Sequence, residues 1–162
     1  MAPGAQVSPV RLAAETWESL FRAQVAVMRK LQAAPAFKKL ALNEYDVLFT
    51  LSRCPSGWLR LNELNDNVLL SQSSLSRLVE RLEKRGLVSR MQAPDDGRGV
   101  LLKLTPEGVA LQKEIGREHV RDISVLMGPA LTAAELKELK RLTEKLRSSL
   151  GSRPAQQRQL DP

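Results

Sequence analysis

The stretch of sequence that decides the fold runs from Asn62 to Gly108 and reads NELNDNVLLSQSSLSRLVERLEKRGLVSRMQAPDDGRGVLLKLTPEG. It predicts a short helix capped by Asn62, then a turn, and then a longer helix that Ser71 opens and Gly86 closes. The short helix is expected to carry three apolar residues, which are Leu64, Val68 and Leu69. Apolar residues spaced by three and four positions give the longer helix one buried face, formed by Leu75, Leu78, Val79 and Leu82.

Two strands, Leu87 to Met91 and Val100 to Leu104, are predicted directly after these helices. The residues between the strands, 93–97, read Ala-Pro-Asp-Asp-Gly, which is a strong turn signal. Two helices followed by such a hairpin have the order of a winged helix-turn-helix. In such a domain the second helix can enter a DNA major groove while the hairpin reaches an adjacent minor groove.

Two shorter elements are predicted upstream of this stretch. Asn43 is expected to cap a helix from Glu44 to Arg53. A break then follows at residues 55–57, which read Pro-Ser-Gly. The apolar pattern from Trp58 to Leu61 alternates weakly and predicts a short strand, with Trp58 packed under the sheet.

Three long amphipathic helices are predicted outside the winged unit. The first runs from Ser8, an N-cap followed by proline, to Gln32. The second runs from Thr105 to about Met127, and a capping box of Thr132 with Glu135 opens the third. A winged unit of roughly 70 residues can bury few of these apolar faces, so we expect a two-fold homodimer. A monomer whose terminal helices cover each other is the alternative.

The predicted fold class is therefore mainly α with a small β-hairpin wing: a winged helix-turn-helix with N- and C-terminal dimerisation helices. The DNA-binding domain is expected at residues 42–104. The helical dimerisation region is expected at residues 8–40 and 105–150. Flexible tails are expected at residues 1–7 and 151–162.

The amino-acid composition limits the classes of function that the protein can have. The chain of 162 residues has 25 Lys and Arg against 18 Asp and Glu, a formal charge of +7 that favours polyanions as partners. Aromatic residues make up only 4%, which argues against a protein that stacks single-stranded bases. One cysteine and one histidine leave no internal disulfide and no histidine or cysteine metal site, and we expect no cofactor. No enzyme motif, secretory signal or membrane-spanning run is found, so we expect a cytoplasmic protein that is not an enzyme and has no membrane partner.

The helix from Ser71 to Arg85 carries the candidate DNA contacts. Its N-terminal N–H groups suit a phosphate, and Arg77 can bind a guanine or a phosphate with two hydrogen bonds. Arg81 and Lys84 lie further along and are expected to contact the DNA backbone. Without DNA binding, the same charges would form a solvated face with Arg77 or Arg81 paired to Glu80. Short polar side chains near the helix start can reach base edges or phosphates; they are Gln72, Ser73, Ser74 and Ser76.

Two segments, SSLSRLVERLEKRGLVSR and DDGRGVLLKLTPEG, closely resemble the MarR family of bacterial winged-helix transcription regulators. In the family's wing pattern, Asp96 and Arg98 match an acidic and a basic position, whereas Ala93 and Gly97 stand where the family has Asp and Arg. The resemblance implies a homodimeric repressor or activator that binds a palindromic site in double-stranded DNA. It also implies control by a small-molecule effector or by oxidation.

Arg98 is the candidate wing contact. A narrow A·T-rich minor groove has an enhanced negative potential that attracts an inserted arginine, and Asp96 can orient that guanidinium. Arg90 and Lys103 are expected to support the wing through phosphate contacts. The alternative is an Asp96–Arg98 pair that only stabilises the turn.

Two further residues have open interpretations. Trp17 lies on the apolar face of the first helix; the resemblance places an effector pocket between the dimer base and the winged lobe there, whereas a core or dimer contact is the simpler interpretation. Cys54 next to Arg53 is a candidate redox sensor, and a small structural residue is the simpler interpretation. A winged-helix module that binds protein instead of DNA is the alternative function, and salt-sensitive duplex binding distinguishes the two.

Overall fold

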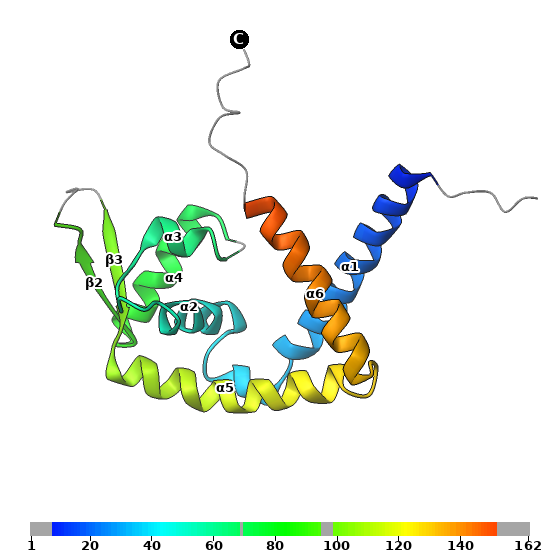
Figure 1. Ribbon diagram of the computed structural model, residues 1–162. Coiled ribbons are helices and arrows are strands. Elements are labelled where there is room, and N and C mark those ends of the chain that lie inside the picture. The colour runs from blue at the N-terminus through cyan, green and yellow to red at the C-terminus, as the bar shows by residue number, and fades with distance from the viewer. Residues whose placement is uncertain (1–7, 69, 95–98, 152–162) are drawn as a thin grey trace, which may run out of the picture. The chain divides into compact units, whose positions relative to one another are not determined.

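The wing of the protein is a three-stranded antiparallel sheet, in the order β1 (Leu59–Arg60), β3 (Val100–Leu104) and β2 (Val88–Gln92). The computed structural model describes residues 8–68, 70–94 and 99–151 and divides the chain into two compact units, residues 1–122 and 123–162. The elements follow one another along the chain as α1 (Pro9–Gln32), η1 (Pro35–Lys38), α2 (Leu42–Ser52), β1 (Leu59–Arg60), α3 (Leu61–Asn65), α4 (Gln72–Lys84), β2 (Val88–Gln92), β3 (Val100–Leu104), α5 (Pro106–Met127) and α6 (Ala133–Gly151). Figure 1 shows α2, α3 and α4 gathered beside the sheet.

The wing hairpin is in register from Val88, opposite Leu104, to Gln92, opposite Val100. Beyond this last pair the Ala93 backbone N–H donates to the carbonyl of Gly99 at 2.8 Å. The short strand β1 pairs with β3, which confirms the predicted short strand and widens the hairpin into a sheet.

Helix α4 forms as the sequence predicts. The Ser71 hydroxyl accepts a hydrogen bond from the backbone N–H of Ser74 at 3.3 Å, which caps the helix. The chain leaves the helix through Gly86, whose φ of +71° lies in the left-handed region that glycine adopts without strain. The predicted apolar face is buried at every position: Leu75, Leu78, Val79 and Leu82.

The starts of α2 and α3 differ from the prediction. Helix α2 begins at Leu42 and not at Glu44, and α3 begins at Leu61 and ends at Asn65, so Val68 lies beyond it. An acidic side chain three residues after each N-cap sets both starts, because its carboxylate accepts the N-cap backbone N–H. The bonds are Ala41 N to Glu44 Oε2 at 3.1 Å and Arg60 N to Glu63 Oε2 at 3.2 Å. Neither Asn43 nor Asn62 is an N-cap.

The core of the winged unit joins the three short helices to the sheet and to the start of α5. The largest fully buried side chains are Leu40, Leu48, Leu64, Leu75, Leu78, Leu82, Leu102, Ile115, Val47 and Val79. Helix α5 begins where Thr105 Oγ1 accepts from the backbone N–H of Gly108 at 3.0 Å and donates to the carbonyl of Gly86 at 2.7 Å. This junction fixes the wing against the first turn of α5.

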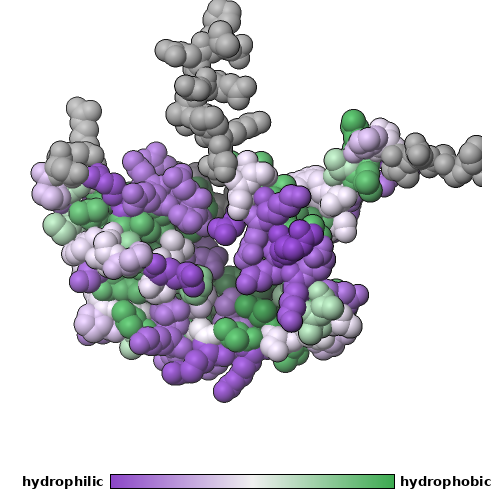
Figure 2. Space-filling view, viewed as in Figure 1, coloured by the Kyte–Doolittle hydropathy of each residue, from purple (hydrophilic) through white to green (hydrophobic). Residues whose placement is uncertain are grey.

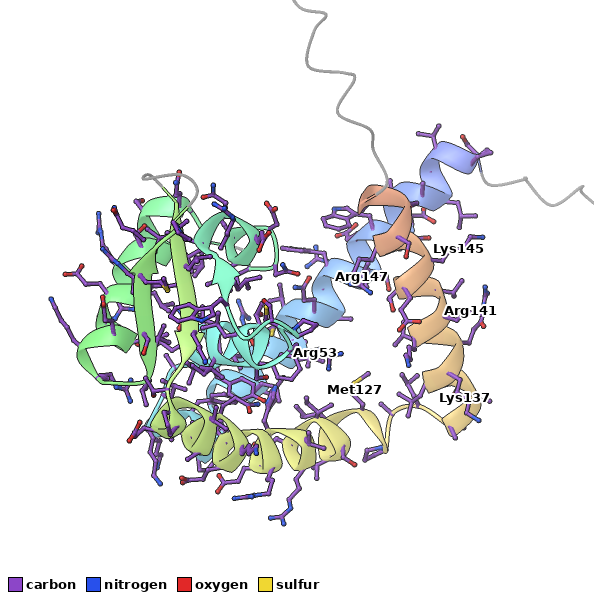
Figure 3. All side chains as sticks on the ribbon, turned by 60° about the vertical axis from the view of Figure 1, so that its left-hand side comes forward. Arg53, Met127, Lys137, Arg141, Lys145 and Arg147 are labelled. Carbon is purple, nitrogen blue, oxygen red and sulfur yellow. The ribbon has the colours of Figure 1, made fainter. Side chains whose placement is uncertain are left out.

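The long helices α1, α5 and α6 have the predicted bounds within a residue or two. The α6 capping box is present, since Thr132 N donates to Glu135 Oε2 at 2.8 Å and Glu135 N donates to Thr132 Oγ1 at 3.3 Å. Along α6 three cations, Lys137, Arg141 and Lys145, follow one side of the helix (Figure 3). A turn of 3₁₀ helix, η1, which the sequence did not predict, follows α1.

Candidate nucleic-acid interface

The polar face of α4 is open to solvent. On the face shown in Figure 2, hydrophilic residues gather over α3, and hydrophobic patches lie below them. The first turn is organised by its own serines, because Ser71 Oγ donates to Ser74 Oγ at 2.8 Å and lies 3.3 Å from Ser73 Oγ. Every candidate contact on this helix is exposed, as the sequence predicted: Gln72, Ser73, Ser74, Ser76, Arg77, Arg81 and Lys84.

The charged side chains of α4 are not equivalent, because most of them have partners. Lys84 pairs with Glu80 at 3.1 Å, and this hydrogen bond lowers the pKa of the Glu80 carboxyl. Arg81 pairs with Glu44 of α2 at 3.5 Å. Glu80 therefore takes Lys84 as its partner instead of either arginine. Within the described residues the Arg77 guanidinium has no ion pair or hydrogen bond, which leaves its full set of donors for a ligand.

A hollow of about 300 Å³ lies beside this helix, lined by Asn43, Leu70, Ser74, Arg77, Leu78 and Arg81. It has space for several water molecules at roughly 30 Å³ each. Two guanidinium groups and the first turn of a helix border one hollow. The positive charge of the two guanidinium groups and of the helix N-terminus attracts an anionic group to this hollow.

Of the four predicted wing contacts, two lie within the described residues and two lie outside them. Arg90 is exposed on β2 and lies 4.0 Å from Glu83, at the limit of an ion pair. Lys103 Nζ lies 5.7 Å from the ring centroid of Trp58, so this aromatic ring borders the sheet as a cation–π partner. Asp96 and Arg98 lie outside the described residues.

Glu44 is a candidate site residue that the sequence did not predict. It is the only buried charged residue in the described part of the chain, 8% exposed as a whole residue, and it contacts Arg81 and Arg85. Its place three residues after the Ala41 N-cap is a sequence signal for a helix start. Its partners on α4 lie 37 and 41 residues further along the chain, and only the fold brings them together.

The surroundings of Cys54 and Trp17 bear on their roles. Cys54 is half-buried, and its Sγ lies 3.2 Å from Ser56 Oγ and donates to the Trp58 carbonyl at 3.3 Å. These contacts within the turn after α2 fit a structural role for the thiol. Arg53, labelled in Figure 3, has its guanidinium 5.8 Å from the Phe49 ring centroid. Trp17 is 63% exposed and not part of the core of the winged unit.

An aromatic cluster between η1, α2 and α5 contains the single histidine. His119 packs edge-on against Phe37 and Tyr45, with ring centroids 5.1 Å and 5.2 Å away. Burial lowers the pKa of the His119 imidazole, although Asp46 and Asp122 partly counteract this. Burial raises the pKa of the Asp46 carboxyl, and His119 offsets part of that shift. His119 Nδ1 is buried without a hydrogen-bond partner among the described residues.

No group of three or more His, Cys, Asp or Glu in the described ranges is arranged to hold a metal ion. Among the same residues, no helix is long and apolar enough to cross a membrane.

Known proteins are similar to this chain in sequence and in fold. The sequence pattern of the MarR family matches residues 40–100. The HTH-type transcriptional repressor Mb2911 of Mycobacterium bovis is 30% identical over 129 residues, covering 80% of this chain and 91% of the relative. The Streptomyces coelicolor MarR family regulator Sco3205, solved in complex with DNA, has a TM-score of 0.74 and 25% identity, covering 94% of this chain and 97% of that one. The PcaV regulator of the same organism, solved with its natural ligand, has a TM-score of 0.63 and 26% identity, covering 93% of this chain and 99% of that one. The chain therefore belongs to the MarR family, and it is a DNA-binding transcriptional regulator and not an enzyme.

Proposed function

We propose that this regulator reads a palindromic operator by placing α4 in the major groove. The observation that carries the proposal is Arg77, an exposed arginine on the open face of α4 that has no partner within the described residues. Arg77 is the candidate for a base contact, or for a phosphate contact at the hollow that it shares with Arg81. Short polar residues of the first two turns are proposed to complete the contact; they are Gln72, Ser73, Ser74 and Ser76.

The remaining cations are proposed to contact the backbone and the minor groove. Lys84 and Arg90 each have an acidic neighbour, so a phosphate would compete with Glu80 or Glu83 for them. Arg98, with Asp96 to orient it, is proposed to enter the minor groove beside the half-site.

We infer that the protein works as a homodimer. Helix α1 leaves Trp17 63% and Phe21 50% exposed, and α6 leaves Leu146 48% and Leu150 68% exposed. Exposed large apolar side chains on a helix mark a surface that binds another protein. In a two-fold homodimer the second copy presents the same apolar helices. Two-fold symmetry places two α4 helices on inverted half-sites about one helical turn apart, roughly 34–36 Å.

We also infer that the regulator is a cytoplasmic repressor released by a small-molecule effector. A relative named as a repressor and a similar structure with a bound natural ligand support this inference. Trp17 is the candidate effector contact. A ligand releases DNA only if it binds one spacing of the two α4 helices more tightly than the other.

The decisive experiment begins with selection of bound duplexes from a random pool by the purified protein. Arg77→Ala should then lower affinity for the selected operator by about 1–3 kcal/mol. If the contact is to a base, the mutation should also relax the preference at one symmetric base pair, and Arg77→Lys should not restore it because an ammonium cannot form the two-pronged bond.

The matched control is Arg117→Ala, which removes the same charge from an exposed position on α5. It should change operator affinity little. Equal losses in the Arg77 and Arg117 variants, or selected sites without two-fold symmetry, would contradict the docking of α4 in the major groove.

A further inference from the structure

The buried carboxylate of Glu44 connects α2 to α4 at the arginines next to the proposed DNA surface. We propose that Glu44 is a positioning residue for operator recognition: it holds Arg81 by the Nε edge of its guanidinium, so that the outer Nη groups are oriented toward a DNA phosphate. This inference rests on the proposed docking of α4, and it adds a residue that does not itself touch DNA.

Glu44 is held by three partners. Its Oε2 accepts hydrogen bonds from the backbone N–H of Ala41 at 3.1 Å and from Nη1 of Arg85 at 3.2 Å. Its Oε1 lies 3.5 Å from Nε of Arg81. Arg85 in turn donates from Nη2 to the carbonyl of Lys39 at 2.9 Å. The carboxylate is thus fixed both by the N-terminus of α2 and by the C-cap residue of α4.

The charges of this cluster do not cancel. One carboxylate faces two guanidinium groups. The side chain of Glu44 is 11% exposed, and the side chains of Arg85 and Arg81 are 40% and 56% exposed. Arg85, the less exposed of the two, donates to Glu44 and to a backbone carbonyl, which is a structural role. Arg81 therefore supplies the uncompensated positive charge on the solvent side of the cluster.

The contact with Glu44 leaves most of the Arg81 donors available. It involves Nε, and the described residues provide no other partner for this guanidinium. The same side chain lines the hollow together with Arg77 and Ser74. A guanidinium whose inner edge is already held loses less conformational freedom when its outer edge binds an anion, so the cluster preorganises the phosphate contact.

Two simpler roles for Glu44 make different predictions. If Glu44 only caps α2, then Gln, whose side-chain oxygen also accepts the Ala41 N–H, should leave DNA binding unchanged. If Glu44 only repels DNA, then Glu44→Gln should tighten binding to every duplex alike, because a negative charge is lost. Positioning instead affects the preference for the operator over random duplex, because a correctly placed phosphate contact sets the register of the protein on its site.

The test is a double-mutant cycle on the full-length protein. Affinities for the selected operator and for random duplex are measured by fluorescence anisotropy in the parent, Glu44→Gln, Arg81→Ala and the double variant. We expect Glu44→Gln to lower the operator-to-random affinity ratio about threefold to tenfold in the parent, and to leave it unchanged when Arg81 is already alanine. A ratio that falls equally in both backgrounds, or that does not fall in the parent, would overturn the proposal.

Two further variants serve as controls. Glu63→Gln changes the equivalent cap on α3, whose carboxylate accepts the Arg60 N–H at 3.2 Å, and it should leave the ratio at the parent value. If Glu44→Gln does not fold, as judged by circular dichroism, Arg81→Lys replaces it. A lysine keeps the charge but cannot bind a carboxylate and a phosphate through two edges, so the ratio should fall; an unchanged ratio would overturn the proposal.

The outcome also separates this inference from the proposed function. If α4 does not read DNA, Arg77→Ala will leave operator binding at the parent value. If α4 reads DNA but Glu44 does not position Arg81, Arg77→Ala will weaken binding and the Glu44 and Arg81 effects will be additive.

Discussion

Gly108 lies in the first turn of α5, where the helix passes over the start of the wing, and Gly108→Ala should destabilise the winged unit. A Cβ at this position would lie 2.0 Å from the Leu87 carbonyl oxygen and 3.3 Å from Leu104 Cδ2. Ordinary van der Waals contact begins near 3.4 Å, and the closest obstacle is backbone, which has no rotamer to change. The helix start and the strand must therefore move apart.

The size of the loss follows from the contacts involved. Overpacking of this kind costs about 1–3 kcal/mol. Movement of α5 also strains the Gly108 N–H to Thr105 Oγ1 bond of 3.0 Å, a helix cap worth about 1 kcal/mol. Alanine recovers at most about 1 kcal/mol through its higher helix propensity. The free energy of unfolding should therefore fall by about 2 kcal/mol.

Urea unfolding followed by circular dichroism, at one fixed protein concentration, measures this loss. The matched control is Gly116→Ala on the same helix, where the new Cβ would lie 3.1 Å from the Tyr45 hydroxyl, so that this neighbour has to move by only a few tenths of an ångström. The control should keep or slightly raise the stability of the parent. A Gly108 variant within 0.5 kcal/mol of the parent, about the error of such measurements, would refute the steric argument.

Three other changes have expected outcomes. Thr132→Ala should destabilise α6 by about 1 kcal/mol in urea unfolding. Because hydrogen bonds from Thr132 lower the pKa of Glu135, the cap's contribution is present above the usual value of 4.5 and is lost as the pH falls through the lowered pKa, which helicity at decreasing pH should report. Arg98→Ala should make the salt dependence of DNA affinity shallower by about one unit of slope and weaken the preference for flanking A·T pairs; an unchanged slope would remove the wing from the interface. Release of DNA by aromatic acids, followed by Trp fluorescence, should weaken in Trp17→Ala, and unaltered release would exclude Trp17 from the effector site.

Much of the fold could be predicted because it depends on neighbours along the chain. The apolar spacing of Leu75, Leu78, Val79 and Leu82 defines one side of α4, and all four residues are buried. Ser71 begins that helix through a hydrogen bond to Ser74, three residues away, and Gly86 ends it through its own positive φ angle. The starts of α2 and α3 differ from the prediction because Glu44 and Glu63, at the third helical position, cap those helices in place of the two asparagines.

The sequence by itself determined the long helices α1, α4, α5 and α6, the apolar face of α4, and the polar and basic face that α4 exposes. Those properties follow from periodicity and capping, which act over three or four residues. Only the tertiary structure decided which charges remain available to a ligand. Glu80 has Lys84, Arg77 and Arg81 within one helical turn, yet it pairs with Lys84, while Arg81 pairs with Glu44, 37 residues earlier in the chain. Helix periodicity does not determine such a pair, because the fold brings the two charges of α2 and α4 to 3.5 Å. That pair distinguishes Arg81 from Arg77, which has no partner within the described residues.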